Sequence, residues 1–128
     1  MVIDPRRSFA HRRQFAGLHL VGDWPDVALQ KLKLDRWSAV VTLTHDPKLD
    51  DAALRIALAS EAFYIGCLGS RKTHQARLSR LRAAGFGDAD LARLHGPIGL
   101  AIGARTPAEI AVSILAEITQ VRRGEEPL

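Results

Sequence analysis

The sequence has little cysteine, few aromatic residues and no long apolar run. Its single cysteine, Cys67, excludes an internal disulfide and a zinc site built from several cysteines, which suits a reducing cytoplasm. No apolar run approaches the length of a membrane span, and no signal peptide opens the chain. No zinc finger, aromatic RNA-binding strand or glycine–lysine-rich tail is present, so nucleic acid is not the expected partner. We therefore expect a cytoplasmic protein that works away from membranes.

The composition is that of one ordinary globular domain, spanning residues 1–128. Hydrophobic residues make up 47% of the chain and charged residues 25%, which is enough apolar material for a real core. The formal charge of +4 comes mainly from arginines at Arg6–Arg13, Arg71–Arg82 and Arg122–Arg123. Small molecules that contain phosphate, or an acidic partner protein, would both account for this charge.

The order of apolar runs and helical spacings predicts alternating strands and helices, which is typical of an α/β fold with a mostly parallel sheet. Expected strands lie at 2–3, 18–21, 39–44 and 63–68, and residues 97–103 form a last short strand or a loop packed on the sheet. Expected helices are 26–32, 50–60 with Asp50 as N-cap, 71–84, a short one near 88–94, and one that begins at Thr106 with a capping box.

The sequence FYIGCLGSRKTHQAR, residues 63–77, organises the rest of the chain. Gly66 and Gly69 are expected to let the backbone turn sharply, and Ser70 to cap the next helix. Arg71 and Lys72 then fall in the first helical turn, where positive charge is unfavourable against the helix dipole. An anion bound between them and the free N–H groups would explain the two cations. The alternative is a plain strand–turn–helix with two solvated basic side chains.

Polar residues also follow the strand at 39–44. Thr44, His45 and Asp46 stand at its carboxyl end, where open α/β sheets bind ligands, and His45 is the candidate general base or hydrogen-bond donor. The alternative is a histidine that only organises its own loop. No spacing typical of a metal site is present.

Three further expectations concern single side chains. Asp4, in Asp4-Pro5-Arg6, stands where dinucleotide folds bind a ribose hydroxyl, although a plain Asp-Pro turn is the alternative. Cys67 is expected in the core. On the helix at 71–84 the leucines face inward, and Arg77, Arg80 and Arg82 are expected in solvent. The last helix is expected to pack on the sheet through one apolar stripe, formed by Ile110, Ile114, Leu115, Ile118 and Val121.

Several motifs in this order resemble the C-terminal Rossmann domain of the xanthine dehydrogenase accessory family (XdhC/CoxI type). They are Thr44–Asp46, Tyr64–Arg71, Pro97–Leu100, Ile102–Ala104 and Thr106–Ala111, and the Asp4–Arg6 segment fits the same pattern. The resemblance implies a Rossmann-like three-layer fold. It also implies an accessory or chaperone protein rather than an enzyme, which binds the molybdenum cofactor (molybdopterin) during its sulfuration. The implied partners are a cysteine desulfurase and a xanthine dehydrogenase-type hydroxylase.

The residues that we expect in cofactor binding are Asp4, Arg6, Thr44, His45, Asp46, Gly66, Gly69, Ser70, Arg71 and Lys72. In the family a first strand, a glycine-rich turn and a helix precede the segment that begins here at Met1, and a cysteine-containing N-terminal domain precedes those. We therefore expect a Rossmann fold truncated at its N-terminal side, in which the neighbours of the missing central strand lack partners. A homo-oligomer, or another chain, would complete such a sheet.

Two other functions remain open. The first is an NAD(P)-dependent oxidoreductase-like dinucleotide-binding domain, with Asp4 on the ribose and His45 as acid or base. It is weakened because the glycine-rich pyrophosphate loop is absent. The second is a ligand-free protein-interaction domain, whose surfaces bind a partner enzyme.

Overall fold

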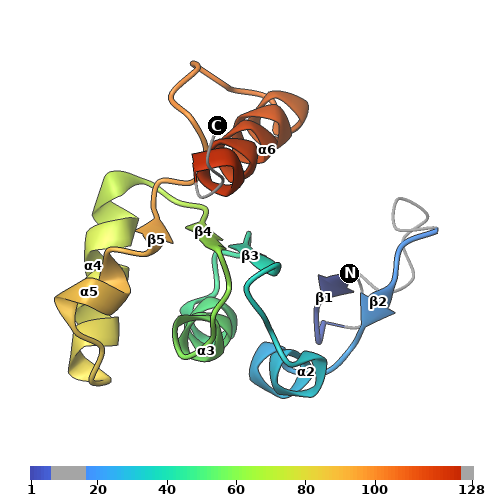
Figure 1. Cartoon of the computed structure of the whole chain (residues 1–128), viewed down its shortest axis with the longest axis vertical. Helices are drawn as coiled ribbons and strands as arrows, with labels where there is room; N and C mark the ends of the chain where they lie inside the picture. Colours follow the sequence, from blue (N-terminus) through green and yellow to red (C-terminus); the bar gives the residue numbers. More distant parts are fainter. Residues whose placement is uncertain (7–16, 125–128) are drawn as a thin grey trace.

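A computed structural model gives the fold and describes residues 1–6 and 17–124. Most of the basic Arg6–Arg13 segment lies outside these residues. In chain order the strands and helices are β1 (Val2–Ile3), β2 (Leu20–Val21), α2 (Pro25–Leu32), β3 (Ala39–Thr42), α3 (Pro47–Leu58), β4 (Tyr64–Cys67), α4 (Arg71–Ala83), α5 (Asp88–Leu91), β5 (Leu94–His95) and α6 (Pro107–Gly124) (Figure 1). From α2 to β4 helices and strands alternate along the chain, as predicted, while β1 is followed directly by β2 and α4 by α5.

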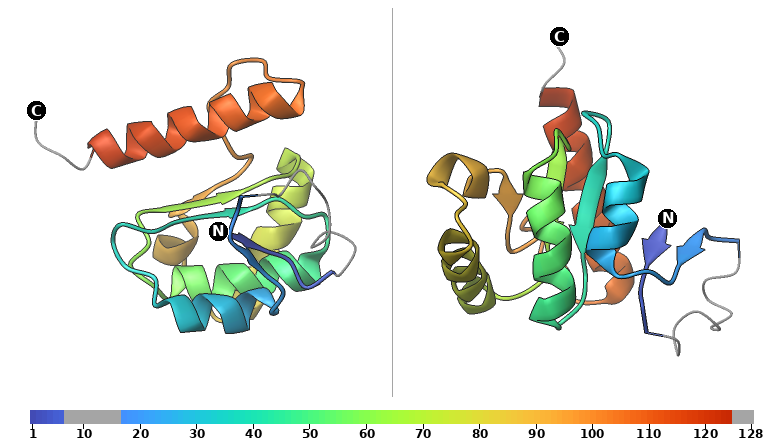
Figure 2. Two further views of the ribbon diagram at one scale, coloured as in Figure 1. Left: turned by 90° about the vertical axis from the view of Figure 1, so that its right-hand side faces the viewer. Right: turned by 90° about the horizontal axis from the view of Figure 1, so that it is seen from below.

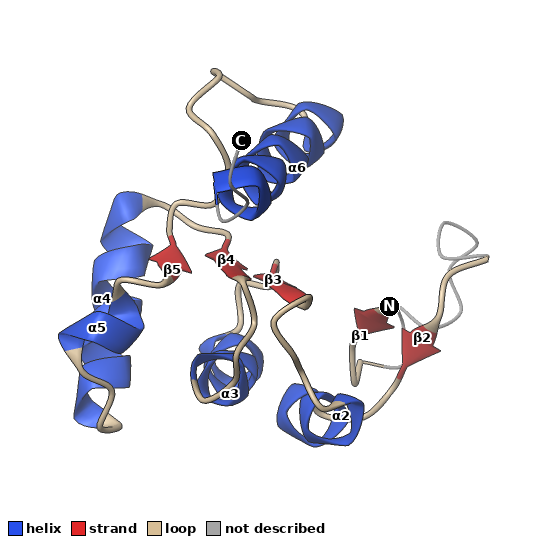
Figure 3. Ribbon diagram, viewed as in Figure 1, coloured by secondary structure: helices blue, strands red, loops and turns tan. Residues whose placement is uncertain are grey.

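All strand pairs in the described residues are parallel. β3, β4 and β5 form one sheet in that order, and the register places Val40 beside Ile65 and Ile65 beside Leu94. α3 connects β3 to β4, and α4 with α5 connects β4 to β5, so the sheet consists of two consecutive βαβ crossovers (Figure 3). Parallel strands joined this way leave their carboxyl ends at one common edge.

The helices cover both faces of the sheet, which confirms the three-layer expectation. α6 lies on one side of β3–β5, and α2 and α3 lie on the other (Figures 1 and 2). One apolar cluster, which includes Leu54, Ile65 and Leu81, fills the space on the α3 and α4 side. A second cluster of Tyr64, Ile98 and Ile114 joins the sheet to α6. The fold is Rossmann-like.

The sheet is divided into two parts. β1 and β2 pair only with each other, with Val2 beside Leu20, and lie to the side of β3 in Figure 1. Within the described residues, neither β1 nor β3 has a hydrogen-bonded strand on its second edge. The described strands thus form two separate parallel sheets, one of β1 and β2 and one of β3, β4 and β5.

Two local expectations were wrong, the N-cap of α3 and the place of Leu115 on α6. α3 begins at Pro47 and is capped by Asp46, because the Asp46 carboxylate accepts from the Lys48 amide at 2.9 Å. For residues 97–103, where a last short strand or a loop was expected, the structure shows the loop, and the last strand is the short β5 just before it. Leu115 does not belong to the buried stripe of α6, since it is 63% exposed.

Candidate anion-binding site

The turn between β4 and α4 has the predicted geometry. Gly69 has φ +142°, a conformation that L side chains rarely adopt. Ser70 is the N-cap of α4, and its hydroxyl oxygen accepts from the Thr73 amide at 3.1 Å. The Leu68 amide donates to the Thr42 carbonyl at 2.9 Å, so the turn starts directly beside the end of β3. The sequence FYIGCLGSRK therefore forms a capped helix start at the carboxyl edge of the sheet.

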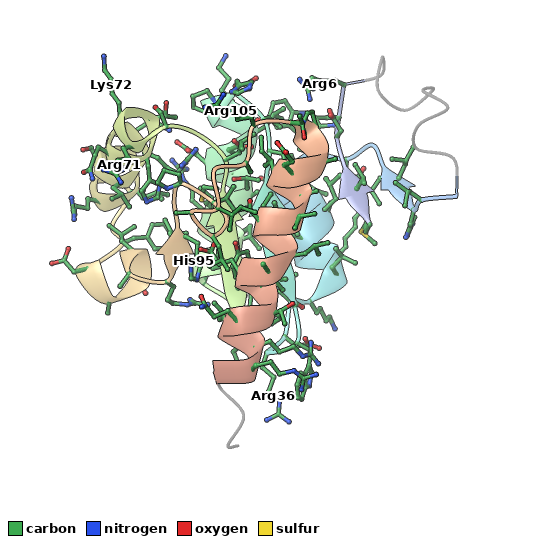
Figure 4. All side chains as sticks on the ribbon, turned by 90° about the horizontal axis from the view of Figure 1, so that it is seen from above. Arg6, Arg36, Arg71, Lys72, His95 and Arg105 are labelled. Atoms are coloured by element: carbon green, nitrogen blue, oxygen red, sulfur yellow. The ribbon has the colours of Figure 1, made fainter. Side chains whose placement is uncertain are left out.

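Arg71 and Lys72, in the first turn of α4, are two cations without an anionic partner among the described residues. Both side chains are exposed, and within residues 1–6 and 17–124 neither forms an ion pair. Their amides belong to the first helical turn, where no intrahelical acceptor exists, and Ser70 occupies only the Thr73 amide. Lys72 extends outward, at the same end of the molecule as Arg6 and Arg105 (Figure 4). Two cations and two amide donors are thus available in the first turn of α4.

Arg77 is the main correction at this site, because it is buried rather than solvated. Its residue is 3% exposed. Its Nη2 donates to the Leu68 carbonyl at 2.9 Å, and its Nη1 to Nδ1 of His74 at 3.0 Å. Its Nε has no hydrogen-bond partner among the described residues. The side chain runs back toward the start of α4, as long helical side chains do, and places a buried positive charge directly below the turn.

The position of Arg77 in the sequence could have predicted that its side chain is buried. It lies four positions before Leu81, which is buried, and three after His74, which is buried as well. Residues at these spacings share one face of a helix. The basic identity of the side chain suggested solvent, but its position on α4 required burial.

Thr44, His45 and Asp46 lie at the same edge, since β3 and β4 are paired neighbours. The Thr44 hydroxyl donates to the Asp50 carboxylate at 2.8 Å and accepts from the Asp46 amide at 3.1 Å. Thr44 and Asp46 therefore stabilise their own loop and the start of α3. His45 is exposed and forms no hydrogen bond with any described residue, so its ring is available to a ligand.

Asp50 and Cys67 belong to the buried layer below this edge. Burial raises the pKa of the Asp50 carboxyl, while its hydrogen bond with Thr44 and the charge of Arg77 oppose that effect. Burial also raises the pKa of the Cys67 thiol, and the residue is fully buried. A thiol in this environment is a core group, as expected from the sequence, and not a nucleophile.

Asp4 and Arg6 pair with each other. Arg6 donates through Nε to one Asp4 oxygen at 3.0 Å and through Nη2 to the other at 2.8 Å, which lowers the pKa of the Asp4 carboxyl. Both oxygens that a ribose would need are therefore already bonded. Asp46 and Asp50 contribute electrostatically to the pKa of Arg6, which is raised mainly by its hydrogen bond with Asp4.

Gly66 does not form a turn, contrary to the expectation from sequence. It lies inside β4, where a Cβ atom would stand 2.5 Å from Ile98 Cδ1 and 2.8 Å from Tyr64 Cε1. Its role is close packing of the loop after β5 on the sheet, and its backbone oxygen accepts from the Thr42 hydroxyl at 3.5 Å. Of Gly66 and Gly69, only Gly69 forms the turn between β4 and α4.

Among the described residues, no group of three or more His, Cys, Asp or Glu side chains is placed to hold a metal ion. In the same part of the chain, no helix is both long and apolar enough to cross a membrane.

The parallel sheet covered by helices on both faces defines a Rossmann-like domain, with the capped, cationic turn at its carboxyl edge. A family model, described as the XdhC Rossmann domain, matches residues 1–118. The chain belongs to this family, which confirms the resemblance found from the sequence.

Relatives and a solved structure agree with this assignment. The chain is 34% identical over 94 residues to the molybdenum cofactor insertion chaperone PaoD of Escherichia coli, covering 73% of this chain and 30% of that protein. It is 33% identical over 104 residues to a Bacillus subtilis protein named as a probable subunit of xanthine dehydrogenase, covering 81% and 29%. A crystal structure described as a xanthine dehydrogenase from Bacillus halodurans superposes with a TM-score of 0.78 at 31% identity, covering 98% of this chain and 35% of that one. The chain thus spans about a third of each of these proteins.

Proposed function

We propose that this chain is a molybdenum cofactor-binding module that assists the maturation of a xanthine dehydrogenase-type hydroxylase. The observation that favours it most is the turn at Gly69–Lys72. Two exposed cations and two unpaired amides belong to this turn, and the buried guanidinium of Arg77 is bonded to the Leu68 carbonyl beside it. The phosphate of a pterin cofactor fits this donor set, because helix starts and charged donors both favour phosphate oxygens.

The roles of the other edge residues follow from their contacts. Ser70 and Gly69 shape the turn, and Arg71 and Lys72 hold the phosphate. His45 is free to contact the rest of the ligand. Thr44 and Asp46 position His45 through the hydrogen bonds of their loop. The bound cofactor would supply the metal chemistry to the client enzyme, while this chain binds and shields it.

Finer parts of this proposal rest on the family resemblance. We propose that the chain works in the cytoplasm and protects the cofactor while a cysteine desulfurase adds sulfur to the cofactor. The names of two relatives, a molybdenum cofactor insertion chaperone and a probable subunit of xanthine dehydrogenase, support the same cofactor and client class.

Reconstitution tests the proposal. An apo xanthine dehydrogenase-type hydroxylase is incubated with molybdenum cofactor, with and without the chain, and the yield of active enzyme is measured. We expect the chain to raise the yield and the double variant Arg71→Ala/Lys72→Ala to lose that effect. The double variant Arg55→Ala/Lys31→Ala, which removes the same charge elsewhere, is the matched control. Equal yields with and without the wild-type chain would contradict the proposal.

The dinucleotide alternative has less support, because both oxygens of Asp4 are bonded to Arg6. The interaction-domain alternative has a specific observation in its favour. Val112 and Leu115 on the outer side of α6 are 59% and 63% exposed, and Ile102 nearby in sequence is 55% exposed. Such a face suits a homo-oligomer or a client enzyme. Light scattering of wild type and Leu115→Glu tests it, and an unchanged mass would contradict a homo-oligomer through this face.

A further inference from the structure

A cavity lies at the edge of the sheet opposite the cationic turn. Its volume is about 510 Å³, which is within the range of small-molecule sites. Its lining comes from segments that lead into strands, with Arg36 before β3, Glu61 and Phe63 before β4, and Arg93 before β5. Figure 4 shows Arg36 at the end of the molecule away from Lys72 and Arg6. The cavity is therefore separate from the site proposed above.

Positive charge dominates this cavity. The Arg93 guanidinium donates to the carbonyls of Leu58, Ser60 and Ala62 at 2.8 to 3.0 Å. These three bonds hold the group in place, but no carboxylate among the described residues neutralises it, and an arginine has further N–H donors. Arg36 is exposed at the rim, and the Glu61 carboxylate is the acidic group of the lining.

His95 is held rigidly in the wall of this cavity. Its ring stacks on Tyr64 with centroids 4.7 Å apart, and its Nδ1 lies 3.5 Å from Glu117 Oε1. The same Glu117 oxygen accepts from the Tyr64 hydroxyl at 2.7 Å and from the Gly99 amide at 3.1 Å. The second ring nitrogen of His95 has no partner in the part of the chain that the structure describes. A fixed imidazole with one nitrogen unused can hydrogen bond with a ligand.

Apolar side chains complete the lining. Phe63 and Val121 form an apolar wall, and Arg122 lies over the Phe63 ring with 5.7 Å between its Cζ and the ring centroid. A third guanidinium thus stands beside the cavity. A ligand with an apolar body and one anionic group would satisfy both parts of this lining.

We propose that the cavity between Arg36, Arg93 and His95 binds a small organic anion, a carboxylate or a phosphate ester, whose apolar body lies against Phe63 and Val121. The proposal does not depend on cofactor binding at Ser70–Lys72. It defines a second ligand site, at the amino edge of the sheet.

The test is a residue-resolved NMR titration of the full chain with benzoate, with phenyl phosphate and with inorganic phosphate. We expect saturable shifts at the amides of 60–63 and 93–95 that persist in Arg71→Ala/Lys72→Ala. Arg36→Glu should weaken binding by at least about tenfold, because it reverses a charge at the anionic group. Arg55→Glu, an equal charge change on an exposed position of α3, should leave the affinity unchanged. The spectrum of each variant shows whether it is folded.

Three results would overturn the proposal. The first is no saturable shift at millimolar probe concentration. The second is shifts confined to residues 69–73, which would assign both probes to the opposite edge. The third is inorganic phosphate binding at 60–63 as tightly as phenyl phosphate, which would show that the apolar wall contributes nothing.

Discussion

Arg77 donates a hydrogen bond from Nη1 to Nδ1 of His74, at 3.0 Å, inside the protein. A guanidinium can only donate, so Nδ1 of His74 must accept without a proton, and the neutral imidazole has its proton on Nε2. His74 also packs tightly on the loop after β5, where a Cβ atom on Gly96 would overlap the imidazole ring. This pair joins α4 to the turn at Leu68 on one side and to the Gly96 loop on the other.

The pair predicts a pH dependence of stability. Burial, and then the charge of Arg77, lower the pKa of His74 from 6.5. The unfolded chain therefore takes up this proton at a higher pH than the folded chain, so the free energy of unfolding falls as the pH drops below 6.5. His74→Gln, measured by urea unfolding across this range, should flatten that part of the profile. Exposed His45→Gln is the control, and equal slopes for wild type and His74→Gln would contradict the assignment.

For Asp50 we expect a pH dependence of the free energy of unfolding with the opposite sign to that of His74. Its folded pKa is raised mainly by burial, so the ionised carboxylate costs stability at neutral pH, and the cost vanishes below the unfolded value of 3.8. Asp50→Asn resembles the protonated acid and keeps an acceptor for Thr44. We expect it to raise the free energy of unfolding at neutral pH and to match wild type at acid pH, with exposed Asp88→Asn as the control. A loss of stability at neutral pH would contradict this prediction and would mean that the attraction between the Asp50 carboxylate and Arg77 outweighs the cost of burial.

Gly66 predicts a packing cost. An alanine there would place Cβ within 3 Å of Ile98 and Tyr64 atoms that lie between the sheet and α6. Gly66→Ala should lower the free energy of unfolding by about 1–3 kcal/mol. At Gly22 nothing lies within 4 Å of the position that a Cβ atom would take, so Gly22→Ala is a matched control with little expected effect. Equal stability of both variants would contradict the close-packing role.

Ser70 predicts a modest loss of stability together with weaker anion binding. Its hydroxyl oxygen caps the Thr73 amide, and Ser70→Ala should cost about 1 kcal/mol. Ser79→Ala is the control on the same helix, because the Ser79 hydroxyl only donates to the Gln75 carbonyl on an exposed surface. Thermal unfolding of the two variants distinguishes the cap from a general effect of losing a hydroxyl.

Much of this fold follows from local sequence signals. The apolar runs at 39–44 and 63–68 contain the strands β3 and β4, and the cap residues Ser70 and Thr106 open helices where expected. The split of the sheet into two parts also followed from the order of strands in a Rossmann fold. The strands and caps depend on neighbours in sequence, and the split of the sheet was expected from the family resemblance and its known strand order.

Other features depend on contacts between distant segments. Arg77 is buried because its guanidinium bonds to the Leu68 carbonyl of the turn. Gly66 is a packing residue because the Ile98 side chain lies against it. The cavity at Arg36 and Arg93 is formed by segments that are 57 positions apart in the numbering. Hydrophobic periodicity records which face of an element is buried, but not which segment buries it.

Binding of the cofactor itself tests the central claim most directly. Molybdopterin is titrated by calorimetry into wild type, Arg71→Ala/Lys72→Ala and the charge-matched control Arg55→Ala/Lys31→Ala. The account predicts that the first double variant raises the Kd by at least about tenfold, because charge-assisted bonds to phosphate are lost, while the control keeps the wild-type value. Indistinguishable Kd values for wild type and Arg71→Ala/Lys72→Ala would show that the turn at Ser70 does not hold the phosphate.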